Sequence, residues 1–185
     1  LEQLGPHRSP GEYEFSPISA GIPEAHQKLV HPVNFNDLDS ILWVTERYQV
    51  AAVLTAPILQ NVGLIKPQHG YLKGLRTLAD RQEFLLIFDE VKTGFRHGMG
   101  GYAEIGDVAP DLAVYGKAVA NGYPLAAIAG PSRWMDHFFH EDTDRRVLLA
   151  GTYNAHPIPT AAALATMEVL SENDGAVYKH CEALG

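Results

Sequence analysis

Short apolar runs alternate regularly with segments of helical periodicity along this chain. The apolar runs end at turn residues or charged residues, which is typical of strands buried in a parallel sheet. We predict strands over residues 50–55, 84–90, 112–117 and 125–130. The alternation predicts a three-layer α/β fold in which a mostly parallel sheet is flanked by helices.

The segments between and after these strands are predicted to be mainly helical. Apolar spacing predicts helices over residues 36–48, 70–82, 133–140 and 158–171, and another from about residue 174. Asn36 or Asp37 is the expected N-cap of the first of them. The first 33 residues are rich in Pro, Gly, Ser and His, and predict irregular structure with short strands near 20–22 and 28–32. Residues 93–107 are predicted to form a Gly-rich loop.

Composition excludes several classes of protein. The 185 residues include 14 Lys plus Arg and 22 Asp plus Glu, a formal net charge of −8. We expect neither nucleic acid nor a membrane as a partner, because phosphate binding needs clustered cations and a membrane span needs roughly 18 apolar residues. Cys181 is the only cysteine, so no intrachain disulfide can form, and we expect a reducing, cytoplasmic location.

Two ionisable residues stand at the ends of predicted strands. Asp89 follows the run LLIF, and Lys117 follows the run LAVYG. Ligands of parallel sheets bind at the carboxyl ends of the strands, so both residues are candidates for chemistry. Simpler interpretations stay open: Asp89 could cap the following loop or pair with Arg96, and Lys117 could be a solvated surface residue.

Taken together, the two residues suggest one kind of cofactor. At the end of a buried strand we expect a lysine to be desolvated, which favours a neutral amine able to bond to a carbonyl. A carboxylate can hold a pyridine nitrogen in its protonated form. A cofactor that has both a pyridine nitrogen and an aldehyde is pyridoxal 5'-phosphate (PLP), and Asp89 and Lys117 would serve its two ends.

Three ordered segments carry a resemblance to a known family. FDEVKTGFR, GDVAPDLAVYGKAVANGYPLAAIAG and GTYNAHPIPTAAALATMEVL resemble the class III PLP-dependent aminotransferases, and most of all the branch that contains glutamate-1-semialdehyde 2,1-aminomutase. The resemblance begins near SAGIP and runs to the end of the chain. It implies a fold-type I PLP enzyme, and it implies a homodimer with the active site at the subunit interface.

The resemblance also implies individual roles. Lys117 matches the lysine that bonds covalently to the cofactor, and Asp89 matches the aspartate that pairs with the pyridine nitrogen. Val91 matches a residue packed on one face of the ring, and Asn61 matches an Asn near the ring oxygen. Thr152 matches a threonine that binds the cofactor phosphate of the neighbouring subunit. The alternatives are an ordinary turn residue for Asn61 and a loop or N-cap residue for Thr152.

The chain also departs from the family pattern. Ala56-Pro57 stands where the family usually has Glu-Pro, and GKAVANGYP differs from the Gly-rich GKVIGGG of the aminomutases. We expect residues 1–185 to be part of the PLP-binding large domain, with the N-terminal phosphate-loop half and the C-terminal small domain outside this sequence. On that expectation, the chain alone is inactive.

The predicted function is therefore PLP-dependent transfer of an amino group, from an amino donor to a carbonyl acceptor or between adjacent carbons of glutamate-1-semialdehyde or a related substrate. The alternatives are an amino-acid racemase or epimerase of the same family, and a non-catalytic fragment that cannot hold the cofactor. No metal is expected, because His137 and His140 lack a carboxylate-rich ligand cluster. GMGGYAEIG does not match a nucleotide-binding loop.

Overall fold

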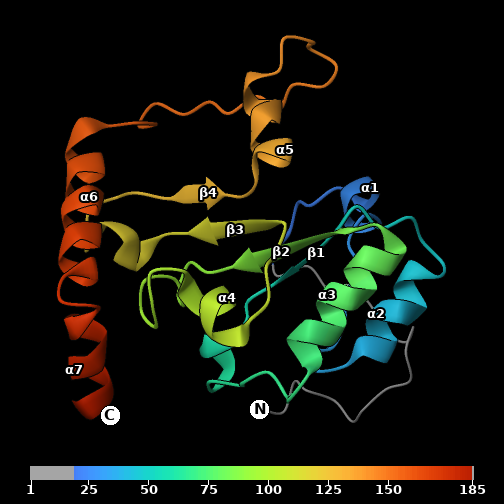
Figure 1. Cartoon of the computed structure of the whole chain (residues 1–185). Coiled ribbons are helices and arrows are strands. Elements are labelled where there is room, and N and C mark those ends of the chain that lie inside the picture. Colours follow the sequence, from blue (N-terminus) through green and yellow to red (C-terminus); the bar gives the residue numbers. More distant parts are fainter. Residues whose placement is uncertain (1–18, 185) are drawn as a thin grey trace. The chain divides into compact units, whose positions relative to one another are not determined.

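The computed structural model describes residues 19–184 and divides into two compact units (Figure 1). Of the described residues, the first unit takes those from 19 to Ala51 together with Pro67–Phe84. The second takes Ala52–Lys66 and the chain from Leu85 onward. All the candidate residues named above fall in the second unit.

The first unit consists of helices. They are α1 (Glu24–Gln27), α2 (Leu38–Thr45) and α3 (Tyr71–Gln82). Asp37 caps α2 as predicted, because its side chain accepts the Ser40 N–H at 3.0 Å. Helices α2 and α3 pack closely at Gly74, where an added Cβ would lie 2.4 Å from Leu38 Cδ1. The short strands predicted near residues 20–22 and 28–32 are wrong, because a turn and α1 occupy this stretch and no strand pairs there.

The second unit contains a four-stranded sheet. Its strands are β1 (Ala52–Thr55), β2 (Leu85–Asp89), β3 (Leu112–Tyr115) and β4 (Ala127–Ala129). They lie in the order β1-β2-β3-β4, the first three parallel and β4 antiparallel to β3. The prediction of a mostly parallel sheet is therefore confirmed. Leu86 and Phe88 of β2 are fully buried, as the apolar run predicted.

Helices of 3 to 15 residues, several of them a single turn, connect and follow these strands. They are η1 (Gln60–Val62), α4 (Gly101–Gly106), η2 (Lys117–Ala120), α5 (Ser132–Met135), η3 (Asp136–Phe139), α6 (Pro157–Ser171) and α7 (Ala176–Leu184). Helix α4 lies inside the segment predicted as a continuous Gly-rich loop, which corrects that prediction. None of the helices in residues 19–184 has the length and apolarity needed to cross a bilayer.

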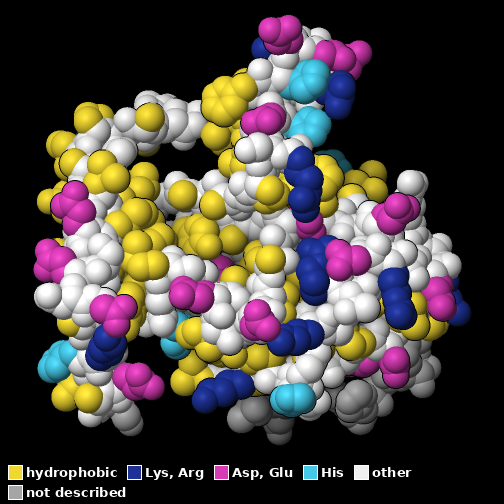
Figure 2. Space-filling view, viewed as in Figure 1, with side chains coloured by type: hydrophobic (Ala, Val, Ile, Leu, Met, Phe, Trp, Pro, Cys, Tyr) yellow, Lys and Arg dark blue, Asp and Glu magenta, His cyan; other side chains and the backbone are white. Residues whose placement is uncertain are grey.

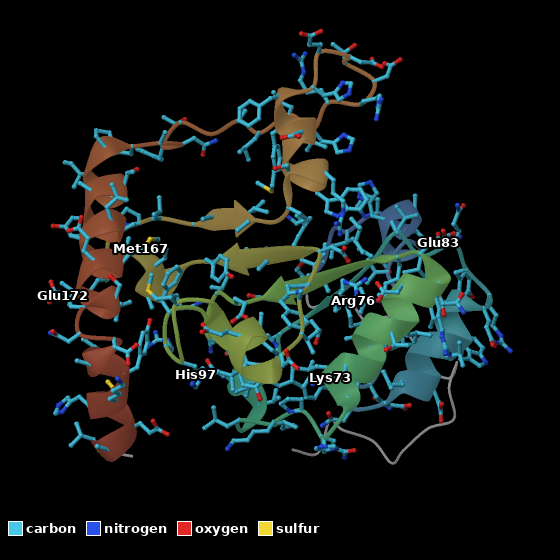
Figure 3. The ribbon with its side chains drawn as sticks, in the orientation of Figure 1. Lys73, Arg76, Glu83, His97, Met167 and Glu172 are labelled. Atoms are coloured by element: carbon cyan, nitrogen blue, oxygen red, sulfur yellow. The ribbon has the colours of Figure 1, made fainter. Side chains whose placement is uncertain are left out.

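Helix α6 packs against η2, beyond the carboxyl ends of β2 and β3 (Figure 1). Val119 and Ala120 of η2 form a small buried cluster with Ala163 of α6. Phe95, Leu125 and Met167 pack against it, and Figure 3 shows Met167 directed from α6 toward η2. This cluster holds the segment that begins at Lys117.

Apolar side chains also lie on the surface of the second unit. Figure 2 shows hydrophobic side chains gathered over α6. Ile158, Leu164 and Val169 of this helix are exposed, as are Leu148 and Tyr153 before it. Contiguous apolar surface of this kind marks an interaction site in many proteins.

Candidate active site

Asp89 is the last residue of β2, at the carboxyl edge of the sheet. It pairs in the sheet with Val114, and its side chain is half-buried. Its Oδ1 accepts the Val91 N–H at 3.0 Å, so the carboxylate does cap the following loop. Because a carboxylate has two oxygens, this cap leaves Asp89 able to accept a further hydrogen bond. Arg96 is exposed, and no ion pair joins it to Asp89 among the described residues.

Lys117 follows β3 but does not belong to it. The strand ends at Tyr115, and Lys117 is the first residue of η2. Its side chain is exposed, so the desolvation expected for a strand end is not found. Its backbone is left-handed, with φ of 46°, a conformation that non-glycine residues adopt at a cost of about 1–2 kcal/mol. Such strain is concentrated at functional sites, and the packing of η2 maintains it here.

One cleft of about 260 Å³ brings the candidate residues together. Asn61, Asp89, Val91 and Lys117 all line it. Val91 lies against the backbone just before Lys117, because a Cβ added to Gly116 would sit 3.3 Å from Val91 Cγ1. Asp89 and Lys117 therefore share one cleft. Thr152 is exposed and does not line this cleft.

A buried carboxylate next to the cleft was missed by sequence reasoning. Glu90 is completely buried, and its carboxylate accepts the N–H groups of Tyr102 and Ala103, each at 3.0 Å, and the Thr93 hydroxyl. The two N–H groups belong to the first turn of α4, where a negative charge stabilises the helix. Glu90 thus ties the loop after Asp89 to α4.

Little space is left around the carboxylate of Glu90. Gly101 has φ of 68°, and a Cβ there would lie 2.9 Å from both carboxylate oxygens. Burial raises the pKa of the Tyr115 hydroxyl, and the negative charge of Glu90 raises it further. Asp89 and Val91 are the sequence neighbours of Glu90, so this network fixes the backbone that presents both to the cleft.

We expect Glu90→Ala in the complete protein to lower the free energy of unfolding by about 3 kcal/mol or more, because three donors lose a charged acceptor inside the protein. Glu90→Gln should cause a smaller loss, since one amide oxygen remains. Glu104→Ala is the matched control, because within residues 19–184 that exposed carboxylate accepts only the Gly100 N–H, at 2.9 Å. Denaturant unfolding monitored by circular dichroism measures all three. Equal losses for Glu90→Ala and Glu104→Ala would contradict this account.

The histidine pair singled out from the sequence lies elsewhere in the second unit. His137 and His140 stack with ring centroids 6.0 Å apart, and His137 Nδ1 lies 2.9 Å from the Arg145 carbonyl oxygen. Across residues 19–184 no group of three or more His, Cys, Asp or Glu side chains is arranged to hold a metal ion.

Comparison with known proteins gives the family. The family model for class-III aminotransferases matches residues 8–183. A glutamate-1-semialdehyde 2,1-aminomutase of Haloquadratum walsbyi is 42% identical over 172 residues, which cover 91% of this chain and 37% of that protein. The chain thus spans little more than a third of the length of this curated relative.

Similar solved structures are also aminotransferases. An omega-transaminase from Sphaerobacter thermophilus matches with a TM-score of 0.76 and 32% identity, over 84% of this chain and 36% of that one. A structure described as a transaminase with PLP bound matches with a TM-score of 0.77 and 29% identity, over 88% of this chain and 39% of that one. The fold is therefore that of the PLP-dependent aminotransferases. The chain belongs to the aminotransferase class-III family.

Proposed function

We propose that the complete protein carrying this chain is a PLP-dependent enzyme that transfers an amino group. The observation that supports the proposal most is the meeting of Asp89, Val91 and Lys117 in one cleft at the carboxyl edge of the sheet. Membership of the class-III family supports the same activity.

The side chains of the cleft fit PLP. The carboxylate of Asp89 suits a pyridinium nitrogen, and the primary amine of Lys117 suits an aldehyde. The apolar side chain of Val91 suits the face of a ring. When bound, PLP supplies a carbonyl carbon that bonds to amines and a ring that takes up electrons.

Each residue then has a definite task. Asp89 would accept a hydrogen bond from the protonated ring nitrogen, and its negative charge would keep the proton there. Lys117 Nζ would hold the cofactor through its aldehyde carbon, with water released as the bond forms, and as a free amine it would move a proton to or from substrate carbon. Val91 would cover one face of the ring and exclude water from it.

The proposed substrate is the one named for similar curated proteins. We propose glutamate-1-semialdehyde or a related amino carbonyl compound as the substrate, because aminomutases acting on it are among the most similar curated proteins. An amino donor and a separate carbonyl acceptor are the corresponding partners of an aminotransferase. Ala56 and Pro57 stand where the family usually has Glu-Pro, and Ala56 lines the cleft, so this chain offers no carboxylate there.

We further propose that the complete protein is a homodimer and that Thr152 binds the cofactor phosphate of the neighbouring subunit. Thr152 is exposed and lies outside its own chain's cleft, and exposed apolar residues flank it. Both observations suit a segment that reaches another subunit. Sedimentation velocity of the complete protein tests the dimer, and a monomer at micromolar concentration would contradict it. The cytoplasmic location stays a prediction from the sequence.

The test of the proposed activity uses the complete protein loaded with PLP and freed of excess cofactor by gel filtration. Incubation with glutamate-1-semialdehyde should yield the isomer in which the amino group is on the adjacent carbon, with no added acceptor. An aminotransferase would instead pass the amino group of an amino acid to an added keto acid. A racemase would invert the amino acid without forming a keto acid, and failure to retain PLP would refute the proposal.

A further inference from the structure

A second lysine, Lys92, lies in the cleft beside the residues already described. It belongs to the turn that follows β2, and it lines the cleft together with Asp89 and Lys117. Its Nζ donates a hydrogen bond to Asn61 Oδ1, which comes from η1, 31 residues earlier in the chain. The bond therefore ties the η1 segment to the turn after β2.

The chemistry of an ammonium group decides how Asn61 is oriented. An ammonium has three donors and no acceptor, so only the amide oxygen of Asn61 can face it. The amide nitrogen then points away from Lys92, and its two hydrogens can only donate. An isolated asparagine has no such preference, because its two ends can exchange by a half-turn of the amide.

The charges of the cleft act in the same direction. The proposed function commits Lys117 to the aldehyde of the cofactor and Asp89 to its ring nitrogen, so Lys92 is the charged side chain of the lining that is left to attract an anion. A lysine beside an amide that can only donate favours a ligand with an anionic oxygen.

We propose that Lys92 is a positioning residue of this site: it holds Asn61 with its amide nitrogen available as a donor, so that Asn61 donates a hydrogen bond to an anionic oxygen of the molecule in the cleft. The proposal rests on the proposed function, because that function supplies two candidate oxygens. One is the ring oxygen of PLP, and the other is the carboxylate of the amino substrate. Lys92 acts through Asn61 and takes no part in the covalent step.

The test compares variants of the complete protein in two binding measurements. The dissociation constant of PLP is measured by equilibrium dialysis, and KM and kcat are measured for an amino acid and for an alkyl amine without a carboxylate. If the oxygen is that of PLP, Lys92→Met raises the dissociation constant about tenfold. If it is the substrate carboxylate, Lys92→Met raises KM for the amino acid by a similar factor and leaves KM for the alkyl amine unchanged.

Three further variants separate positioning from charge and from folding. Lys92→Arg keeps hydrogen-bond donors at this position. The constant that Lys92→Met raises should therefore stay within about threefold of its value in the unaltered protein. Asn61→Ala should reproduce the loss, and the double variant should be no worse than either single one, because the two residues act as a unit. Arg96→Met removes a cation from the same exposed loop outside the cleft and should change neither measurement.

The outcomes distinguish this inference from the proposed function. If the unaltered protein retains PLP and Lys92→Met changes neither the dissociation constant nor the amino-acid KM by more than about twofold, Lys92 has no positioning role. Additive effects of Lys92→Met and Asn61→Ala would also refute it. If the unaltered protein retains no PLP, the proposed function fails, and this inference fails with it.

Discussion

Replacing Lys117 by Ala in the complete protein is expected to reduce turnover by at least about a thousandfold, because the covalent bond to the cofactor and the proton transfer depend on one amine. The loss should appear in kcat rather than only in KM. The fold should survive, since the side chain is exposed and the buried part of η2 is Val119 and Ala120. Rates are measured with the amino substrate at saturating PLP.

Lys179→Ala provides the matched control for that variant. Lys179 is an exposed lysine of α7 whose Nζ lies 2.6 Å from Asp174 Oδ2, and its removal should leave turnover unchanged. A Lys117→Ala protein that keeps more than about a tenth of the normal rate would show that another group carries the chemistry.

Asp89→Asn is expected to lower turnover by about 10²–10⁴-fold while PLP is still retained. The neutral amide no longer holds the proton on the ring nitrogen, so the pKa of that nitrogen falls. The fold should be preserved, because the amide oxygen of Asn can still accept the Val91 N–H that Asp89 Oδ1 accepts now. Turnover and retained cofactor are measured on the same preparation.

The corresponding control is Asp144→Asn, which removes one exposed carboxylate of the second unit. It should have no effect on either quantity. Asp89→Asn with near-normal turnover would mean that the charge at this position is not needed. Loss of folding in Asp89→Asn would instead show that the cap to Val91 is the main role of the residue.

Local patterns in the sequence are sufficient to predict the strands of the second unit. The run LLIFD predicts β2 because largely apolar residues suit a buried strand, and Leu86 and Phe88 are indeed fully buried. The apolar runs also predict β1 and β3, although Ala52 and Leu54 of β1 are exposed.

The run LLIFD also identifies Asp89 as a candidate, because a carboxylate at the end of a buried strand needs a polar partner. The run LAVYG identifies Lys117 as a candidate by the same argument. In the structure the strand ends at Tyr115, and Lys117 is the first residue of a 3-10 helix.

The supporting residues could not be found from local patterns. Glu90 stabilises α4 through N–H groups 12 and 13 residues away, and Lys92 orients an amide 31 residues away. Neither contact leaves a periodic signal, because each depends on how separate segments meet. The adjacent pair Asp89-Glu90 at a strand end offered one hint, since two carboxylates there need different partners.

Chemical trapping of the cofactor tests the central claim most directly. The complete protein loaded with PLP is reduced with borohydride, digested, and the modified peptide is identified by mass spectrometry. We expect a reduced pyridoxyl group on Lys117 and none on Lys92, although both amines line the cleft. Modification of Lys92 or of any other lysine in place of Lys117, or no covalent modification at all, would contradict it.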